Sequence, residues 1–328
     1  MKERMLLGLA ACLVLLVGGA HAEIVTVSWY LDYNDNGIGM EPLFIPPGVI
    51  LDHSPYYAAA PEDWGWRFDL ADRVPPDATG VASASLWVNA WDSDVSEGQI
   101  DLIYADGVEL GALWDTYGRY WRTTFFELPT EVLDALWADE ELYCFIDVDS
   151  DNTGHRVTLG YSVLFVDYIV PDGDPQPNLT VHRFWSPVLS GHFYTTDERE
   201  RARLVYDYPA IWTYEGPAYQ AFPDDRSSSV APVYRFWSGQ NSAHFYTIDE
   251  AEKNHIIANY DYVWTFEGVA FYAHPEGEQP TSASPVYRFW SDVLSRHFYT
   301  MSEAERDYLI DNYPIIWTYE GIAWYAYP

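Results

Sequence analysis

The sequence is poor in cysteine and in positive charge, and both shortages limit what the protein can be. Its 328 residues include two cysteines, and 17 basic residues stand against 50 acidic ones, which gives a formal net charge of −33 at pH 7. A surface this negative repels nucleic acid and anionic membranes, so neither is expected as a partner. It would attract divalent cations, although a solubilising or salt-adapted surface explains the charge equally well.

Long hydrophobic runs are also scarce, and the one that exists lies at the N-terminus. Lys2 and Arg4 precede an apolar run from Met5 to Gly18, and Ala20-His21-Ala22 follows as a small-residue cleavage pattern. This order predicts a secretory signal peptide over residues 1–22, because the run is short for a membrane span. The chain is therefore expected to be secreted or at the cell surface, with no membrane span.

Removal of this leader takes Cys12 with it and leaves Cys144 as the remaining cysteine. An intramolecular disulfide is then excluded, and Cys144 is expected to be a small buried apolar residue. A lipoprotein signal at Cys12 is the alternative, but the apolar run continues past that residue and little of it comes before. With 48% hydrophobic and 17% aromatic residues, the chain has material for a core and enough length for two domains.

Residues 23–170 are predicted to form an antiparallel β-sandwich domain. Apolar and polar residues alternate in segments such as Val25–Tyr30 and Leu142–Val148, and turns containing Pro and Gly separate these segments. A short helix is expected at Pro129–Trp137. The segment Leu86–Leu113 resembles the jelly-roll-like modules of secreted bacterial surface and carbohydrate-associated proteins. That resemblance implies a binding or adhesion module.

Two acidic segments resemble calcium-binding loops, because oxygens at alternate positions can converge on one cation. Calcium is the one cofactor that the sequence suggests. The first segment ends at Gly37, but the twelfth position of an EF-hand loop would be Leu43 instead of Glu. Both segments could equally be ordinary turns rich in Asp and Asn. The candidate ligands are Asp32, Asn34 and Asn36 in the first segment, Asp147, Asp149 and Asp151 in the second, and a weaker third cluster of Asp92, Asp94 and Glu97.

Beyond a linker at residues 171–180, one pattern occurs three times, over residues 181–223, 233–275 and 286–328. Each copy contains Arg-Phe-Trp-Ser, then His-Phe-Tyr-Thr, then Trp-Thr-aromatic-Glu-Gly. A fixed period with fixed internal landmarks indicates a repeat architecture. Each copy is expected to form about four short strands, two of them flanking the Glu-Gly turn, and one short helix.

This pattern resembles a secreted bacterial and fungal repeat family of unknown function, with the core Y-R-F-[WY]…H-F-Y-T…W-x-[YF]-E-G-x-A-[FWY], usually present in threes. The resemblance covers residues 181–328, and the first copy departs from it at Pro217 and Gln220. It implies an accessory module without established catalysis. Three copies with short strands suggest a pseudo-three-fold, trefoil-like closed barrel. The predicted fold class is therefore mainly β in both domains.

Three polar residues recur in every copy and are predicted to hold the scaffold together. Because buried charges need partners, each arginine is expected to pair with a glutamate, and Arg288 in particular with Glu320 or Glu303. The histidines could instead bind a metal ion as a three-His set on the pseudo-three-fold axis. The recurring residues are Arg183, Arg235 and Arg288; His192, His244 and His297; and Glu215, Glu267 and Glu320.

The chain has 15 Trp and 27 Tyr, more than a core alone is expected to use. Aromatic faces stack on sugar rings, so the expected function is non-enzymatic binding or adhesion to a glycan or matrix component outside the cell. No catalytic residue is predicted. The candidate ligand-binding residues are Trp185, Trp237, Trp290, Trp212, Trp264, Trp317 and Trp324.

Two other functions stay open from the sequence. The first is a secreted glycoside hydrolase with accessory repeats, which would use paired carboxylates such as Asp92 with Asp94 or Asp147 with Asp149. The second is a structural component of a surface layer or filament. The sequence contains no G-x-S-x-G or H-E-x-x-H motif that would favour an enzyme.

Overall fold

The computed structural model describes residues 16–17, 20–32, 44–45, 56–59, 64–91, 93, 95, 98–116, 121–148, 156–171 and 176–328. The predicted fold class is confirmed, since antiparallel sheets and a few short helices make up these residues. They divide into two compact units, with the boundary between residues 172 and 173. Within the described ranges, none of the helices has the length and apolar character needed to cross a membrane.

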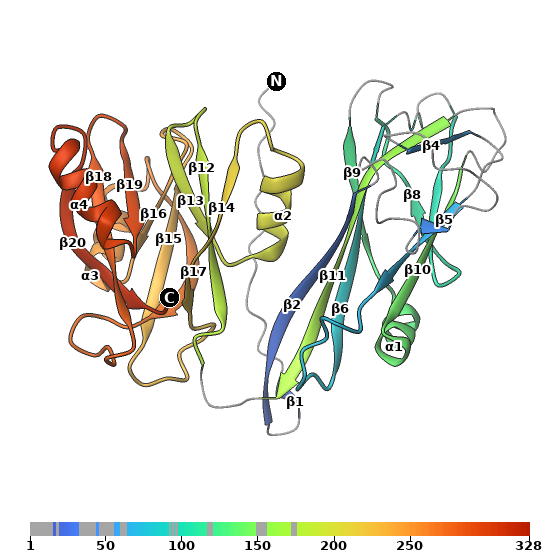
Figure 1. The fold of residues 1–328 in the computed structure, drawn as a ribbon, viewed down its shortest axis with the longest axis horizontal. Helices are drawn as coiled ribbons and strands as arrows, with labels where there is room; N and C mark the ends of the chain where they lie inside the picture. The colour runs from blue at the N-terminus through green and yellow to red at the C-terminus, as the bar shows by residue number, and fades with distance from the viewer. Residues whose placement is uncertain are drawn as a thin grey trace. The chain divides into compact units, whose positions relative to one another are not determined.

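The first unit contains two antiparallel sheets (Figure 1). One has the strand order β1-β2-β11-β6-β9, with β4 also paired to β11, and the other has the order β3-β5-β10-β7-β8. The expected signal peptide includes the start of β2, where Ala22 pairs with Pro171. The strands are β1 Leu16–Val17, β2 Ala20–Asp32, β3 Phe44–Ile45, β4 Tyr56–Ala59, β5 Trp64–Asp69, β6 Gly80–Trp91, β7 Leu102–Ala105, β8 Val108–Ala112, β9 Arg122–Glu127, β10 Glu141–Asp147 and β11 Arg156–Pro171.

Residues from both sheets join in one hydrophobic core, as the alternation in the sequence predicts. In β10, Leu142, Cys144 and Ile146 are buried in this core, which leaves Tyr143 and the other alternate residues on the opposite face. Cys144 is buried as predicted, and burial raises the pKa of its thiol well above the ordinary value. The finer comparison with jelly-roll modules stays a prediction.

The predicted helix of this unit is present as α1, Thr130–Asp139. It begins after Pro129, whose fixed φ suits a helix start, and its buried residues are Val132 and Leu136. These residues are four apart and therefore lie on one face, which packs into the core. The helix ends at Glu140, which adopts the left-handed conformation with φ of 54°.

In the second unit, each repeat forms one three-stranded sheet, with orders β13-β12-β14, β16-β15-β17 and β19-β18-β20. One helix follows the second strand of each repeat and lies on the outside of the unit (Figure 1). The elements are β12 Leu179–Ser186, β13 Gly191–Thr195, α2 Glu198–Tyr206 and β14 Thr213–Ala221; β15 Ala231–Ser238, β16 Ala243–Thr247, α3 Glu250–Asn259 and β17 Thr265–Ala273; β18 Ser284–Ser291, β19 Arg296–Thr300, α4 Glu303–Asn312 and β20 Thr318–Ala326.

Each helix of the repeats begins after a side chain that caps its first turn. Asp197 and Asp249 accept hydrogen bonds from two backbone amides at the starts of α2 and α3, and Ser302 accepts one at the start of α4. Acidic residues in each first turn also suit the positive end of the helix dipole.

The expectation of two strands on either side of the Glu-Gly turn is wrong. Each Trp-Thr-aromatic-Glu-Gly segment continues through the glycine as one nine-residue strand. Gly216, Gly268 and Gly321 have φ values of 108°, 112° and 109°, a region that glycine adopts without a side-chain clash. The pairing shifts register nearby, for example between Arg235 and Phe236, so a β-bulge takes the place of a turn.

Three tyrosines fill the centre of the repeat unit and connect the copies in a cycle. The hydroxyl of Tyr194 donates to the carbonyl oxygen of Tyr299 at 2.5 Å, Tyr246 to that of Tyr194 at 2.6 Å, and Tyr299 to that of Tyr246 at 2.7 Å. All three side chains are buried. Each copy therefore supplies a donor to one neighbour and an acceptor to the other.

The far ends of the last strands also connect the copies. Gln220 forms a bridge with Tyr327, Phe222 with Tyr272, and His274 with Tyr325. The three sheets thus stay separate and meet through single bridges, and the trefoil-like closed barrel stays a prediction in its details.

Candidate functional site

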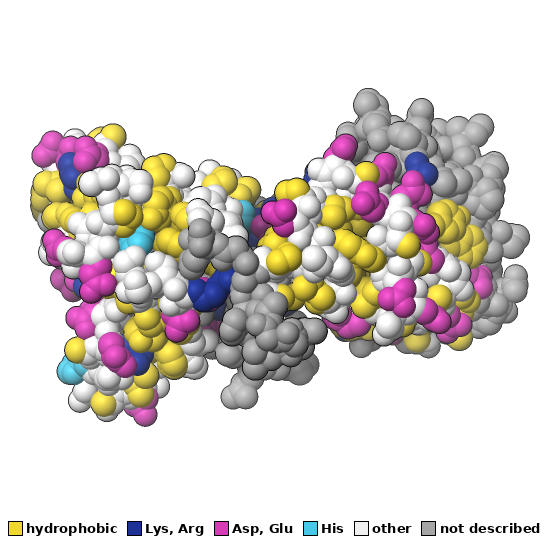
Figure 2. Space-filling view, turned by 90° about the horizontal axis from the view of Figure 1, so that it is seen from below, with side chains coloured by type: hydrophobic (Ala, Val, Ile, Leu, Met, Phe, Trp, Pro, Cys, Tyr) yellow, Lys and Arg dark blue, Asp and Glu magenta, His cyan; other side chains and the backbone are white. Residues whose placement is uncertain are grey.

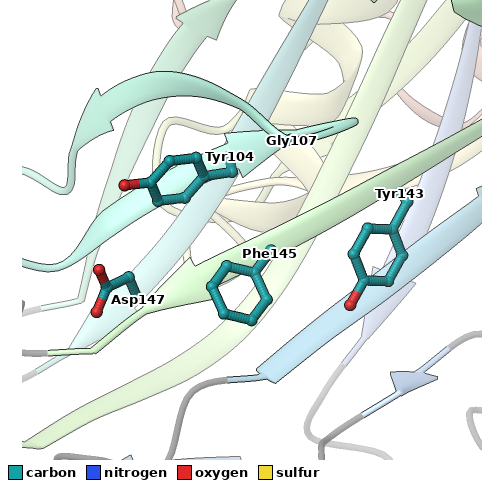
Figure 3. Close-up of a pocket in the computed structure, with 5 residues that line it drawn as sticks. All are labelled: Tyr104, Gly107, Tyr143, Phe145 and Asp147. Carbon is teal, nitrogen blue, oxygen red and sulfur yellow. The ribbon is translucent and has the colours of Figure 1, made fainter.

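The outer face of the second sheet in the first unit carries an open pocket. It is lined by Tyr104, Gly107, Tyr143, Phe145 and Asp147. Figure 3 shows the rings of Tyr143 and Phe145 and the carboxylate of Asp147 along β10, with the ring of Tyr104 next to Phe145. Alternation along β10 places three pocket side chains on this face, because every second residue of the strand points into the core.

Pairing between strands sets the arrangement of the rings. Phe145 is the register partner of Tyr104 on β7, and their ring centroids are 6.1 Å apart with planes inclined by 59°. On the other side of β10, Phe145 is the partner of Gly65 on β5. A β-carbon at Gly65 would collide with the hydroxyl and ring of Tyr143, so glycine leaves room for that ring to lie over β5.

The turn between β7 and β8 is fastened to β10 at the end of the pocket. The backbone amide of Asp106 donates to the carbonyl oxygen of Tyr143 at 2.7 Å, and the amide of Tyr143 donates to the Asp106 carboxylate at 3.0 Å. Burial, Asp139 and Glu141 raise the pKa of Asp106, and the hydrogen bond from Tyr143 opposes them. These bonds hold Gly107, the tip of the turn, in a fixed position beside the rings.

The pocket is acidic as well as aromatic. Burial raises the pKa of Tyr104 above its ordinary value, and the carboxylates of Glu109 and Asp147 raise it further. The Tyr104 phenol therefore stays protonated and hydrogen-bonds to Glu109, and the remaining carboxylate oxygens nearby are acceptors. This set suits a ligand with hydroxyl groups and an apolar face, and it disfavours an anionic ligand.

The sequence predicted only Asp147 among these pocket residues, as a calcium ligand and, in the alternative function, as one of the paired carboxylates of a hydrolase. Of the other calcium candidates, Asp32 is the last residue of β2. Within the described ranges, no group of three or more His, Cys, Asp and Glu residues is placed to hold a metal ion. Calcium binding and the paired carboxylates of a hydrolase therefore stay predictions. The candidates that lie outside the described residues are Asn34, Asn36, Asp149, Asp151, Asp92, Asp94 and Glu97.

In the repeat unit, each recurring arginine contacts the recurring glutamate of its own copy. The Arg288 Nε lies 2.9 Å from a carboxylate oxygen of Glu320, as predicted, and the equivalent distances are 2.8 Å for Arg183 with Glu215 and for Arg235 with Glu267. The alternative partner of Arg288, Glu303, is instead placed near Tyr287 and Arg306.

Each arginine also has a second partner that the sequence did not predict, on the helix of the preceding copy. Arg235 pairs with Glu200 at 2.9 Å and Arg288 with Glu252 at 2.9 Å. The cycle closes because Arg183, in the first copy, pairs at 3.0 Å with Glu305 in the third. A sequence signal for this second partner existed, because these glutamates occupy the same helical position in all three copies.

The recurring histidines lie beside the same ion pairs. The Nε2 atoms of His192, His244 and His297 are each 3.4 Å from the glutamate of their own copy. Each ring also packs on the tryptophan of its own copy, with centroids 4.6–4.8 Å apart. The centre of the repeat unit, where a three-His metal site would lie, holds the three tyrosines of the central cycle. Each histidine instead contacts the glutamate of its own copy.

The structure separates the candidate tryptophans into three groups. Trp324 is 1% exposed and belongs to the central core, so its prediction as a ligand-binding residue is wrong. Trp212, Trp264 and Trp317 are half-buried and pack on the small core under each helix. Trp185, Trp237 and Trp290 are half-buried against the histidines. None of the seven lines the pocket of the first unit.

Acid is expected to weaken the repeat unit through these groups. Burial lowers the pKa of His244 and His297 below the ordinary 6.5, so the unfolded chain takes up their protons at a higher pH than the folded one. Burial alone would raise the pKa of Glu267, but His244 and Arg235 hold it below the ordinary 4.5. Both effects give stability that is present at neutral pH and is lost as the pH falls, first below about 6.5 and then below about 4.5.

Thermal unfolding measured from about pH 7 to about pH 5 at constant ionic strength checks this linkage. The melting temperature should fall with pH, and His244→Asn should reduce the slope. A melting temperature that stays constant or rises over this range would contradict the expected sign.

No curated protein matches the sequence. Among solved structures, the chain is similar to the dimeric latent PorU from Porphyromonas gingivalis, at 15% identity and a TM-score of 0.28. That match covers 48% of this chain and 14% of the other, and a score this low does not indicate a shared fold. The similarity to a family lies in the second unit: residues 180–327 match the model of a domain of unknown function (DUF5648).

Proposed function

We propose that this protein is an exported binding protein that recognises a neutral glycan through the pocket on β7 and β10. One observation carries the proposal: the side chains of Tyr104, Tyr143, Phe145 and Asp147 line one open pocket on an outer sheet face. Aromatic rings pack against the apolar face of a sugar, and a carboxylate accepts hydrogen bonds from its hydroxyl groups. Two paired strands and a hydrogen-bonded turn hold these side chains in place, so binding costs little conformational entropy.

The negative charge of the protein favours a neutral glycan over an acidic one as the ligand. The net charge of −33 would repel a polyanion, and Asp147 and Glu109 lie close to Tyr104. A polymer with hydroxyl groups and no charge avoids this repulsion.

Export is supported by the predicted signal peptide over residues 1–22. The resemblance of the repeats to a secreted family usually found in threes is consistent with an accessory role for the second unit, outside the cell. A calcium ion bound by the first acidic segment, at Asp32, would be a structural ion in this proposal and not part of the pocket.

Phe145→Ala is expected to weaken glycan binding by about tenfold or more. Burying an aromatic ring against a ligand contributes roughly 1.5–3 kcal/mol, and each 1.4 kcal/mol is a factor of ten in affinity. The measurement is calorimetric titration of the full chain with neutral hexasaccharides: β-1,4-glucan, β-1,4-linked N-acetylglucosamine, α-1,4-glucan and β-1,4-mannan.

The matched control is Tyr262→Ala, which removes a ring that is 76% exposed in the second unit. It should leave the affinity unchanged. Equal affinities for the wild type and Phe145→Ala, or the absence of binding to all four hexasaccharides, would count against the pocket.

A further inference from the structure

The three repeats expose an aromatic ring at the same position of their last strand. Tyr214, Phe266 and Tyr319 are 37%, 42% and 38% exposed. Single exposed apolar residues are normal on a protein surface, but here the same exposure recurs three times. Another exposed position, in the loop before each ring, holds a different residue in each copy: Ala210, Tyr262 and Ile315.

In the second and third repeats, buried rings support the exposed one from behind. The centroid of Phe266 lies 5.1 Å from that of Phe236 and 6.1 Å from that of Tyr234. Tyr319 has the same support, at 5.1 Å from Phe289 and 6.2 Å from Tyr287. The supporting rings are buried, so the exposed ring is held in one orientation with part of its surface open.

A cation and a carboxylate from the helix lie beside each of these aromatic pairs. In the second repeat, the Lys253 Nζ is 4.4 Å from the ring centroid of Tyr234 and 3.1 Å from a carboxylate oxygen of Glu250. Glu250 is largely exposed, which leaves its carboxylate open to hydrogen bonds from a ligand.

The third repeat has the same set with different residues. The guanidinium of Arg306 is 4.5 Å from the ring centroid of Tyr287, whose hydroxyl donates to Glu303 at 3.2 Å. Glu303 is also largely exposed. Two copies that differ in sequence therefore present the same chemistry: an exposed ring, a supporting tyrosine that carries a cation, and a largely exposed carboxylate next to that cation.

The first repeat differs, because its polar groups already bind one another. His182 contacts the Tyr214 hydroxyl at 2.8 Å through Nδ1 and Glu198 at 2.9 Å through Nε2. Arg201 also pairs with Glu198 at 2.8 Å. The carboxylate of Glu198 is 23% exposed, against 72% for Glu250 and 73% for Glu303, so the second and third repeats present the more accessible carboxylates.

We propose that Phe266 and Tyr319 each bind one sugar ring of a neutral glycan, as a second binding surface separate from the pocket on β7 and β10. The inference rests on the proposed function in taking a glycan as the ligand. Each site offers an apolar ring surface for the face of a sugar, and a cation with a carboxylate for adjacent hydroxyl groups. Hydrophobic and acidic side chains lie next to one another on the surface of the repeat unit in Figure 2.

Two sites on one rigid unit make the expected binding depend on the length of the glycan. Once one site is occupied, the second binds from the same molecule at a high effective concentration, and the affinity rises without new contacts. A polymer should therefore bind more tightly than a hexasaccharide of the same sugar.

The test is titration of the full chain with the four neutral hexasaccharides and their polymers. Phe266→Ala combined with Tyr319→Ala should weaken binding to the polymer at least tenfold and remove two sites from the stoichiometry. The matched control combines Tyr262→Ala with Ile315→Ala, which removes two other exposed side chains of the same repeats. This control should change neither the affinity for the polymer nor the stoichiometry. Glu250→Gln with Glu303→Gln, at largely exposed positions, gives a second test that does not disturb the aromatic packing, and it should weaken binding several-fold.

The outcomes separate this surface from the pocket. If Phe145→Ala weakens binding while both repeat variants bind as the wild type, the inference is overturned and the proposed function stands. If the repeat variants lose binding and Phe145→Ala does not, the repeats are the glycan site and the pocket is not. Absence of binding to every hexasaccharide and polymer overturns both.

Discussion

Replacing Arg235 by methionine is expected to destabilise the repeat unit by about 3–5 kcal/mol. Arg235 lies between Glu200 of the preceding copy, at 2.9 Å, and Glu267 of its own copy, at 2.8 Å. The three side chains are 17%, 9% and 13% exposed, so the substitution leaves two largely buried carboxylates without their cation. Burial by itself would lower the pKa of Arg235, yet Glu200 and Glu267 hold it above the ordinary value.

Denaturant unfolding of the full chain, followed by tryptophan fluorescence, measures the loss. The control is Arg226→Met, because Arg226 pairs with Asp224 two residues away and both are a quarter exposed. Such a pair contributes about 0–1 kcal/mol. Adding Glu200→Gln and Glu267→Gln to Arg235→Met should recover part of the stability, since the unpaired charges are then gone. A loss for Arg235→Met no larger than that for Arg226→Met would show that the ion pairs do not hold the copies together.

Deleting residues 281–328, the third repeat, is expected to abolish cooperative unfolding of the two repeats that remain. The deletion removes the acceptor of the Tyr194 hydroxyl, the Glu305 partner of Arg183 and the bridge from Tyr327 to Gln220. An open solenoid would lose only the interface of its last repeat. Here both neighbours of the missing copy lose contacts, because the third repeat touches the first as well as the second.

Hydrogen exchange distinguishes these two cases. Amides in β12 and β13 should lose protection to the same extent as those in β15 and β16, while protection in β6 and β10 of the first unit should change little. Retained protection in the first repeat would show that closure by three copies is not required. Tyr299→Phe, which removes one hydroxyl of the central cycle and keeps the ring, should show a much smaller effect, on the order of 1–3 kcal/mol for a lost buried hydrogen bond.

Local features of the chain were predictable because they depend on neighbours in the sequence. The repeats and the helix starts at Asp197, Asp249 and Ser302 follow from short motifs, since a capping side chain binds amides two or three residues away. The usual behaviour of a free cysteine predicted that Cys144 would be buried, and the alternation along β10 agrees with it. Alternation could not predict the pocket, because the pattern does not say which outer face carries aromatic rings on adjacent strands.

The candidate residues that were wrong or incomplete depend on distant parts of the chain. Trp324 is a residue type that often binds sugars, but its side chain lies in the central core, where all three copies meet. Glu200 looked like one of several acidic residues in the first turn of a helix, and its partner is 35 residues further along the chain.

The sequence by itself determined the mainly β composition, the acidic charge, the three copies and the local starts of their helices. Tertiary structure alone decided that Arg235 pairs with a glutamate of another copy, that Trp324 is enclosed, and that Phe145 lies beside Tyr104. The physical reason is that strand alternation and helix capping act over a few residues of chain. Strand register and cyclic closure bring together residues far apart in sequence, and they depend on how all the copies pack at once.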